Sequence, residues 1–435
     1  MGGDDRHARR SPTRARGSRL FAGKGVAGAF FACCVLGCGA SDFSPAQVSA
    51  GPSNAVTEGS HPYWQLLAVV TAPRPTLQEG HVLVAISGGI AAISYGSATE
   101  VDWYALDPNL SSPAAPTAHP ITVSGAVNAI AVDGSRLAIG VPWPTGNDKV
   151  LVFDSVTSDA SPVVLTDPDL PVGASEALGY AIALSGDTLA ASAPDTSYDD
   201  NIGHVLVYHR SNGVWSTRPV ADIHAPPDLE QTCFTTPADE RFGLTVGLAS
   251  LGSGGSAHEV LIAGRPLLIQ PTPCAQNQTA KFAGNVFVYD HPPSSPWPTS
   301  PSSILASPNP AAASCHFGAS IGVGSESIVI AQDAPQQQLV FAAGHTVPAQ
   351  QLQIGSTMAF DGATLAATDG TVITAYRSDT DQGADRFSTF SRLQNPLGFS
   401  AQWASIAVSG EMIIAGATDG KAYVFLQRST GTDQN

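Results

Sequence analysis

The fold of this chain is decided by the stretch Leu178–Tyr208, LGYAIALSGDTLAASAPDTSYDDNIGHVLVY. Small and apolar residues alternate up to a Ser-Gly-Asp turn at 185–187, and a second alternating run at 188–193 ends at a proline. An Asp-rich loop then leads to Val-Leu-Val-Tyr at 205–208. Alternation with a period of two around a glycine turn is typical of β-strands, and no helical period is sustained. We expect three strands, in a sheet that needs partners because it cannot bury both faces alone.

Seven copies of this glycine turn between apolar runs occur along the chain. They begin at Val84, Ile130, Ile182, Val246, Ile321, Met358 and Ile406. Each copy is followed by an alternating run with aromatic residues, from VDWYAL at 101 to AYVFLQ at 422, and then by a weaker strand. Four strands that recur about every 40 to 70 residues indicate propeller blades. The expected fold is therefore all-β, a seven-bladed β-propeller of four-stranded antiparallel blades.

The two ends of the repeat region indicate how the ring closes. After the last aromatic run at 422 only polar residues remain, so the seventh blade lacks an outer strand. Tyr63–Pro73, before the first turn, matches Val214–Pro226 of the third blade. An open sheet edge invites aggregation, so we expect the N-terminal run to complete the last blade. The first and fifth copies are weak, and the sequence leaves their completeness open.

The order of the repeated residues resembles the FG-GAP repeat family of β-propellers, which is related to the head of integrin α chains. The Phe-Gly part stands at 178–179, 242–243 and 317–318, and the Gly-Ala-Pro part at 140–142, 192–194 and 264–266. Later copies have lost the proline, at 367–369 and 416–418. Many relatives hold calcium in a D-x-D-x-D-G loop, but no copy here has it. The turn Ser185-Gly186-Asp187 is too tight for such a loop, so no calcium site is expected.

The residues before the repeats predict export. A basic segment, an apolar run of about 12 residues and small residues precede Cys38, as in a secretory signal. Val35-Leu36-Gly37-Cys38 resembles the bacterial lipobox, in which the cysteine carries lipid; simple cleavage and an uncleaved anchor are the alternatives. We expect a signal peptide at 1–37, a flexible tether at 38–62, the propeller at 63–428 and a polar tail at 429–435. Gly39 after the cysteine fits outer-membrane anchoring, with secretion as the alternative.

The charge of the chain excludes some partners. The formal net charge is −16, and removal of the leader, which carries seven basic and two acidic residues, makes it −21. Nucleic acid and anionic lipid surfaces would repel such a body. We therefore expect no nucleic-acid partner and contact with a membrane only through the lipid anchor. The chain is also expected to be a monomer.

Candidate ligand-binding residues come from the connections between the second and third strands of each blade. These connections and the links between blades emerge on one face, which we call the long-loop face; the turns between first and second strands emerge on the opposite, short-turn face. Clustered carboxylates at a channel mouth could bind a cation or a hydroxyl-rich ligand. The alternative is that they are solvated aspartates that cap turns. The candidates are Asp195, Tyr198, Asp199, Asp200, Arg265, Asp333, Asp369 and Asp419.

No catalytic or metal centre is evident in the sequence. Gly318, Ser320 and Gly322 fit a Gly-x-Ser-x-Gly pattern, but they fall on an inner strand and not on the strand-to-helix turn that a hydrolase elbow needs. The histidines have no metal-ligand spacing, and no cofactor is expected. Among the three cysteines of the body, Cys233 and Cys274 are the preferred disulfide pair, with Cys315 as the alternative partner.

These observations predict a non-catalytic binding or scaffolding propeller that recognises a protein or a glycan through its long-loop face. The alternative is a lyase or hydrolase acting on polysaccharide at the channel mouth. The fold does not separate the two, because function depends on the site. The scarcity of basic residues near the long loops, chiefly Arg265 and Lys281, favours binding.

Overall fold

The computed structural model divides the chain into two compact units, residues 1–48 and 49–435, and every residue described below belongs to the second. The expected leader, tether and polar tail lie outside the described residues. The structure describes residues 63–71, 82–95, 99–107, 116–142, 148–158, 160–170, 175–194, 203–226, 241–251, 258–266, 284–308, 316–324, 326–333, 336–352, 355, 357–378, 386–394 and 402–428.

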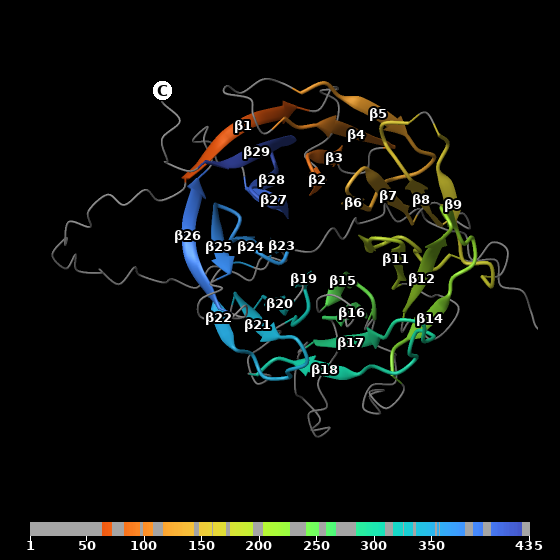
Figure 1. Ribbon diagram of the computed structural model, residues 1–435. Coiled ribbons are helices and arrows are strands. Elements are labelled where there is room, and N and C mark those ends of the chain that lie inside the picture. The colour runs from red at the N-terminus through yellow and green to blue at the C-terminus, as the bar shows by residue number, and fades with distance from the viewer. Residues whose placement is uncertain are drawn as a thin grey trace, which may run out of the picture. The chain divides into compact units, whose positions relative to one another are not determined.

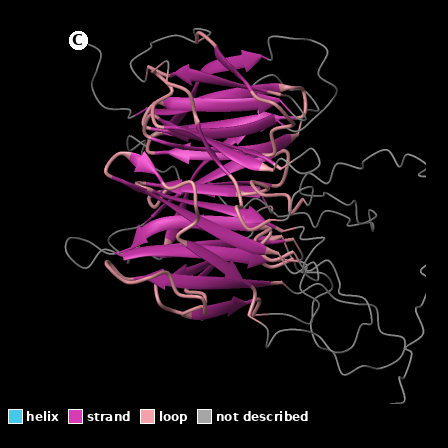
Figure 2. Cartoon of the chain, turned by 90° about the vertical axis from the view of Figure 1, so that its right-hand side faces the viewer, coloured by secondary structure: helices cyan, strands magenta, loops and turns pink. Residues whose placement is uncertain are grey.

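These residues form 29 strands and no helix, and the strands make seven antiparallel sheets arranged as a ring of blades (Figure 1). The predicted fold class, a seven-bladed β-propeller, is confirmed. Seen edge-on, the strands run across the thickness of the ring, so their connections emerge on two opposite faces (Figure 2). No helix long and apolar enough to cross a membrane occurs in the described part of the chain.

The blades follow one another in chain order. Blade I holds β2 (Val82–Ser87), β3 (Ile90–Tyr95), β4 (Glu100–Ala105) and β5 (His119–Thr122). Blade II holds β6 (Ala129–Asp133), β7 (Arg136–Val141), β8 (Lys149–Phe153) and β9 (Val163–Leu165). Blade III holds β10 (Ile182–Ser185), β11 (Thr188–Ala193), β12 (His204–Ser211), the short β13 (Val214–Trp215) and β14 (Ala221–His224). Blade IV holds β15 (Thr245–Leu251), β16 (His258–Arg265), β17 (Asn285–His291) and β18 (Ser303–Ala306).

The remaining blades are built in the same way. Blade V holds β19 (Ser320–Val323), β20 (Ser327–Gln332), β21 (Gln337–Ala342) and β22 (Gln350–Leu352). Blade VI holds β23 (Thr357–Phe360), β24 (Thr364–Thr368), β25 (Val372–Ser378) and β26 (Phe387–Gln394). Blade VII holds β27 (Trp403–Ser409), β28 (Met412–Ala417) and β29 (Lys421–Arg428). Blades I and V, which are weak in the sequence pattern, each contain four strands.

The outer strand of blade VII is β1 (Tyr63–Thr71), from the other end of the described chain. It pairs antiparallel with β29, from Tyr63 opposite Arg428 to Thr71 opposite Lys421, with a bulge between Leu66 and Ala68. In Figure 1, β1 follows the rim of the ring just outside β29. Because β1 occupies the outer edge, the backbone groups of β29 are paired on both sides.

The hydrophobic core is divided among the junctions of the ring. Seven clusters of buried side chains occur, one between each pair of neighbouring blades. Leu206 and Tyr208 on one face of β12 pack against blade II, while Val205 and Val207 on the other face pack against blade IV. Alternate residues of a strand point to opposite faces, so each middle strand serves two cores. This explains why these strands are almost continuously apolar.

Neighbouring blades approach at backbone distance near the ends of several second strands. A Cβ added at Gly140 on β7 would lie 2.0 Å from the carbonyl oxygen of Gly179, which precedes blade III. A Cβ at Gly264 on β16 would lie 2.9 Å from the carbonyl oxygen of Gly318, which precedes blade V. The glycine of the Gly-Ala-Pro part therefore faces the glycine of the next Phe-Gly part. The equivalent residue is glycine, serine, alanine or threonine in every blade: Ser94, Gly140, Ser192, Gly264, Ala331, Thr368 and Gly416.

The glycine turns also connect neighbouring blades on the short-turn face. The residue before the turn glycine accepts a hydrogen bond from a turn glycine N–H of the next blade. This bond joins Gly186 N to Asp133 Oδ2 at 2.8 Å and Gly134 N to Ser87 Oγ at 3.0 Å. The same arrangement joins Gly88 N to Ser409 Oγ at 3.3 Å, and Gly410 N to Asp361 Oδ2 at 2.5 Å. The Ser or Asp before glycine thus links blades VI, VII, I, II and III in sequence.

Substitution of Gly140 tests the backbone contact between blades II and III. Gly140→Ala places a methyl group against the Gly179 carbonyl and forces the blades apart. Overpacking of this kind costs about 1–3 kcal/mol, and we expect the free energy of unfolding to fall by an amount near the upper value. The matched variant Ser192→Ala keeps a Cβ at the same position of blade III and loses the hydroxyl that accepts the Ala181 N–H at 2.9 Å, a cost of about 1 kcal/mol. Urea unfolding measures both, and a Gly140→Ala protein as stable as the parent would contradict this packing.

Candidate functional site

Three of the candidate aspartates follow the second strands of their blades on the long-loop face. Asp333 comes after β20, Asp369 after β24 and Asp419 after β28. They therefore occupy corresponding places in blades V, VI and VII, each with partners in its own blade. Asp333 Oδ2 lies 3.0 Å from His316 Nδ1, on the segment that leads into β19.

Asp369 and Asp419 cap the turns that follow them. Asp369 Oδ1 accepts hydrogen bonds from Thr371 N, Thr371 Oγ1 and Val372 N at 2.7–3.0 Å. Partial burial opposes ionisation, but these hydrogen bonds outweigh it and hold the pKa of Asp369 below its ordinary value. Asp419 accepts the Lys421 N–H at 3.1 Å and the Tyr423 hydroxyl at 2.8 Å. These contacts match the alternative reading, turn-capping aspartates.

The other predicted residues are placed as follows. Arg265 ends β16 and is a buried residue, 1% exposed. Arg265 belongs to blade IV and Asp369 to blade VI, where the hydrogen bonds of Asp369 go to its own turn. The other candidates fall outside the described residues: Asp195, Tyr198, Asp199, Asp200, Cys38, Cys233, Cys274 and Cys315.

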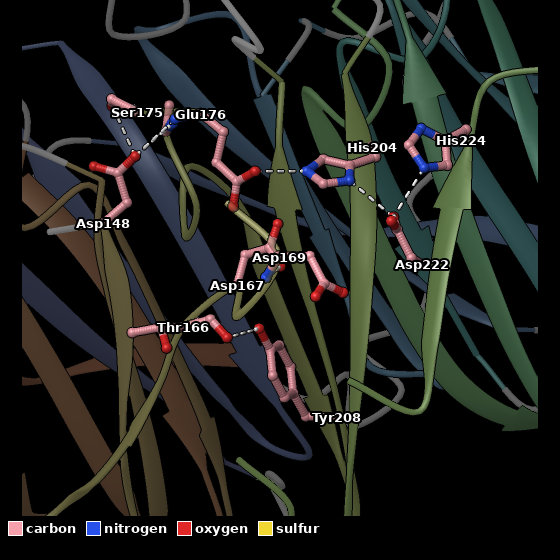
Figure 3. Close-up of polar contacts among 11 residues, drawn as sticks. Asp148, Thr166, Asp167, Asp169, Ser175, Glu176, His204, Tyr208, Asp222 and His224 are labelled. Carbon is pink, nitrogen blue, oxygen red and sulfur yellow. Dashed lines mark hydrogen bonds and ion pairs between the residues drawn. The ribbon is translucent and has the colours of Figure 1, made fainter. Parts of the chain in front are cut away.

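A cluster of ionisable side chains that the sequence did not single out lies on the long-loop face, at the junction of blades II and III. It contains Glu176, His204, Asp222 and His224 (Figure 3). The pairing of β12 with β14 places His204 opposite His224 and Leu206 opposite Asp222. Opposite residues of an antiparallel pair share a face, as do residues two apart on one strand. All three side chains therefore lie on the face of blade III that packs against blade II.

Hydrogen bonds join the cluster in a row. His204 Nε2 lies 2.9 Å from Glu176 Oε2, and His204 Nδ1 lies 2.8 Å from Asp222 Oδ1. The second oxygen of Asp222 lies 3.1 Å from His224 Nε2. Glu176 and His204 are buried, whereas the side chains of Asp222 and His224 are 46% and 57% exposed. The row thus runs from the protein interior to the surface.

Glu176 is held in place by the connection between β9 and β10. Asp148 Oδ2, just before β8, accepts hydrogen bonds from Ser175 Oγ at 2.7 Å and from Glu176 N and Ala177 N at 2.9 Å. Three hydrogen bonds to one carboxylate oxygen fix this connection against blade II. The Glu176 side chain then points across the junction to His204 in blade III (Figure 3).

The charges of the row are interdependent. Burial works to lower the pKa of His204, but its hydrogen bonds to Asp222 and Glu176 prevail and raise it to about 10. Burial likewise opposes ionisation of Asp222, yet the hydrogen bonds from His204 and His224 bring its pKa well below the ordinary value. Burial raises the pKa of Glu176, and His204 offsets this only in part.

Two roles follow from this arrangement. As an imidazolium with both N–H groups engaged, His204 has no lone pair with which to accept a proton, so it is a tie between two carboxylates and not a general base. The same side chains could also hold a metal ion. The potential ligand atoms of His204, Asp222 and His224 lie within 4.8 Å of one another, as do those of Asp167, Glu176 and His204.

A second polar region lies on the short-turn face, between blades III and IV. A groove of about 510 Å³ is lined there by residues that include His209, Glu259, His291 and Trp297. Glu259 accepts the Thr188 hydroxyl at 2.5 Å and lies 3.1 Å from His291 Nδ1. The His291 ring stacks on Trp297 at 4.2 Å between centroids. These side chains are held by one another across the junction.

Comparisons with known proteins identify no family for this chain. No protein-family model matches the chain, and no curated protein matches it either. A chain of the solved structure described as "Crystal Structure of Mitotic Checkpoint Complex" is similar over 88% of this chain and 98% of that chain, with 11% sequence identity and a TM-score of 0.49. The architecture itself, seven blades in a ring, is that of a β-propeller.

A signal for the cluster was present in the sequence. Asp222-Ile223-His224 is an alternating polar pair on a strand, and His204 opens the aromatic run of the preceding strand. Alternation places Asp222 and His224 on one face. The register between β12 and β14 and the position of Glu176 in a connection could not be read from spacing, so the histidines looked scattered.

Removal of His204 tests the tie between the blades. His204→Ala removes the hydrogen bond to Glu176 Oε2 and leaves this buried carboxylate without its imidazole partner, so we expect a loss of about 3–5 kcal/mol in the free energy of unfolding. Glu176→Gln added to this variant removes the buried charge and should restore part of the loss. Urea denaturation of the single and double variants measures the effect. A single variant within about 0.5 kcal/mol of the parent would exclude a structural tie.

The lowered pKa of Asp369 predicts an acid-dependent contribution to stability. A carboxyl whose folded pKa lies below its unfolded pKa stabilises the fold above the unfolded value, and this stabilisation is lost as the pH falls through the folded value. Asp369→Asn keeps an oxygen acceptor but does not titrate. Between pH 6 and pH 3, which lie about two units above and about one unit below the ordinary Asp pKa, the variant should therefore lose less stability than the parent. Equal losses in urea midpoints would show that Asp369 makes no such contribution.

Proposed function

We propose that the chain is a non-catalytic binding propeller that recognises a protein or a glycan through its long-loop face. The observation that carries this proposal is the distribution of chain between strands. The two longest stretches between described strands run from His224 to Thr245 and from Arg265 to Asn285, and both begin and end at the long-loop side of blades III and IV. By contrast, turns between first and second strands are as short as Gly88-Gly89. Long connections on a rigid scaffold are where binding residues concentrate.

The placement of ionisable groups supports binding over catalysis. Asp369 Oδ1 and both carboxylate oxygens of Asp419 accept hydrogen bonds within their own blades. Arg265 is buried, and His204 has a carboxylate against each ring nitrogen. A lyase or hydrolase needs an acid and a base that both reach one substrate. Asp369, Asp419, Arg265 and His204 do not provide such a pair, because each is buried or already hydrogen-bonded.

The setting that we propose is the surface of a bacterial cell. The lipobox-like residues before Cys38 support export and lipid attachment, with Gly39 consistent with the outer membrane. The small and polar residues of 38–62 would hold the propeller, residues 63–428, away from the membrane. The Phe-Gly and Gly-Ala-Pro parts support a distant relation to FG-GAP propellers, because the structure gives their glycines a shared packing role.

A binding screen tests this function. Residues 49–435 hold every described strand and all seven core clusters, so this unit is suited to a glycan array and to cross-linking on the intact cell surface. Replacement of 267–283 with a short Gly-Ser linker should abolish the binding that is found. The matched control replaces 252–257, the first turn of the same blade on the opposite face, and should leave binding unchanged.

Two results would overturn the proposal. Binding that survives loss of 267–283 but not loss of 252–257 would assign recognition to the short-turn face. New reducing ends or unsaturated sugars released from a bound polysaccharide would show catalysis and favour the lyase or hydrolase alternative.

A further inference from the structure

We propose that His204, Asp222 and His224 form a binding site for one divalent transition-metal ion, with Glu176 as the carboxylate that orients His204. This site is independent of the binding function proposed above. It differs from the calcium loops of FG-GAP relatives, because it lies on the outer strands of blade III at the long-loop face and uses two imidazoles.

The ligand atoms already converge. Asp222 places one oxygen 2.8 Å from His204 Nδ1 and the other 3.1 Å from His224 Nε2. The two rings lie 5.2 Å apart between centroids, at 35° to each other. An ion with metal–ligand distances of about 2.0–2.2 Å fits between such atoms after small rotations. His224 has room for such rotation, because its side chain is 57% exposed.

The second observation is the partner of the other ring nitrogen of His204. A histidine that binds a metal almost always donates its remaining N–H to a carboxylate, a backbone carbonyl or water, which fixes the ring and raises its basicity. Glu176, 1% exposed, stands 2.9 Å from His204 Nε2 and is itself positioned by Asp148 through the backbone N–H of Glu176. His204 is thus oriented for coordination by a buried shell that spans two blades.

The ligand set selects the class of metal. Imidazole and carboxylate together suit Zn²⁺ and its neighbours in the first transition row, whereas Ca²⁺ and Mg²⁺ require oxygen ligands. With neutral imidazoles, the carboxylates of Asp222 and Glu176 supply two negative charges, which a divalent ion balances. The ion takes the place of the protons shared along the row at His204 Nδ1 and His224 Nε2, while the Nε2 proton of His204 stays with Glu176. Solvent reaches the exposed end of the row, so water completes the coordination.

The alternative group of Asp167, Glu176 and His204 is less suited to this ion. It offers one imidazole nitrogen in place of two, and Glu176 and His204 are both buried there. Its participation can be tested separately, because Asp167 belongs to this group alone and His224 belongs to the proposed site alone.

Zinc titration of the chelator-treated, untagged unit of residues 49–435 tests the site. Calorimetry should show one Zn²⁺ bound per chain, and the thermal unfolding midpoint should rise with free Zn²⁺, because an ion that binds only the folded state stabilises it. Ca²⁺ and Mg²⁺ should produce neither effect. His224→Ala, a change at a half-exposed side chain that leaves the core intact, should abolish the one-to-one binding.

Three comparisons assign the ion to these residues. Glu176→Gln should retain binding with an affinity about 10–100-fold lower, as expected for an orienting carboxylate. Asp167→Asn, and His258→Ala on the opposite face, should bind Zn²⁺ as the parent does. Co²⁺ should give the absorption of a four-coordinate ion without a thiolate charge-transfer band.

Contradiction of the proposal would be equally direct. The site is excluded if the folded parent binds no zinc, or if His224→Ala binds it with unchanged affinity. A thiolate band in the Co²⁺ spectrum would assign the metal to cysteines. Loss of binding in Asp167→Asn with retention in His224→Ala would assign it to the buried group.

Discussion

The close approach of neighbouring blades is the constraint on which the rest of the ring depends. The carbonyl oxygen of Gly179 occupies the space where Gly140 would carry a side chain, and Gly318 stands in a similar relation to Gly264. The equivalent position holds no residue larger than threonine in any blade, so a bulky residue there would push two neighbouring blades apart and distort the closed ring. The two glycine motifs of the repeat are therefore the two sides of one contact between successive blades, and not two separate features of one blade.

The position of the charged cluster follows from the same geometry. Between blades II and III, the apolar part of the junction is filled by Leu206 and Tyr208 of β12 against blade II. Where β12 begins at His204, the junction reaches the long-loop face and the packed groups become ionisable. Polar groups that remain buried there require partners, which Glu176 and Asp222 supply from the two sides. The hydrogen bonds of His204 thus continue the contact between blades II and III beyond the hydrophobic cluster.

The fold could be predicted from the sequence because each blade is specified by short local patterns that recur along the chain. Alternation, glycine turns and seven recurrences predicted seven blades, and even the degenerate copies at Val84 and Ile321 formed four-stranded sheets. The role of the residue before each turn glycine was not predicted, because its hydrogen bond goes to the next blade. The same limit applies to the site. Asp369 and Asp419 stood out by their place in the repeat but cap their own turns, whereas Glu176 and His204 are 28 residues apart and meet only through tertiary packing.

The pairing of β1 with β29 has a consequence for the order in which the molecule forms. Tyr63 is paired with Arg428, so the seventh sheet joins residues from opposite ends of the described chain. During synthesis, blades I to VI can form one after another from neighbouring segments, whereas β1 must wait for β29 to emerge. The entropic cost of closing so long a loop arises only at that step, and contacts between residues distant in sequence slow folding. Until then β1 remains an unpaired apolar strand, which makes this nine-residue segment the part of the ring most dependent on protection from aggregation during biosynthesis.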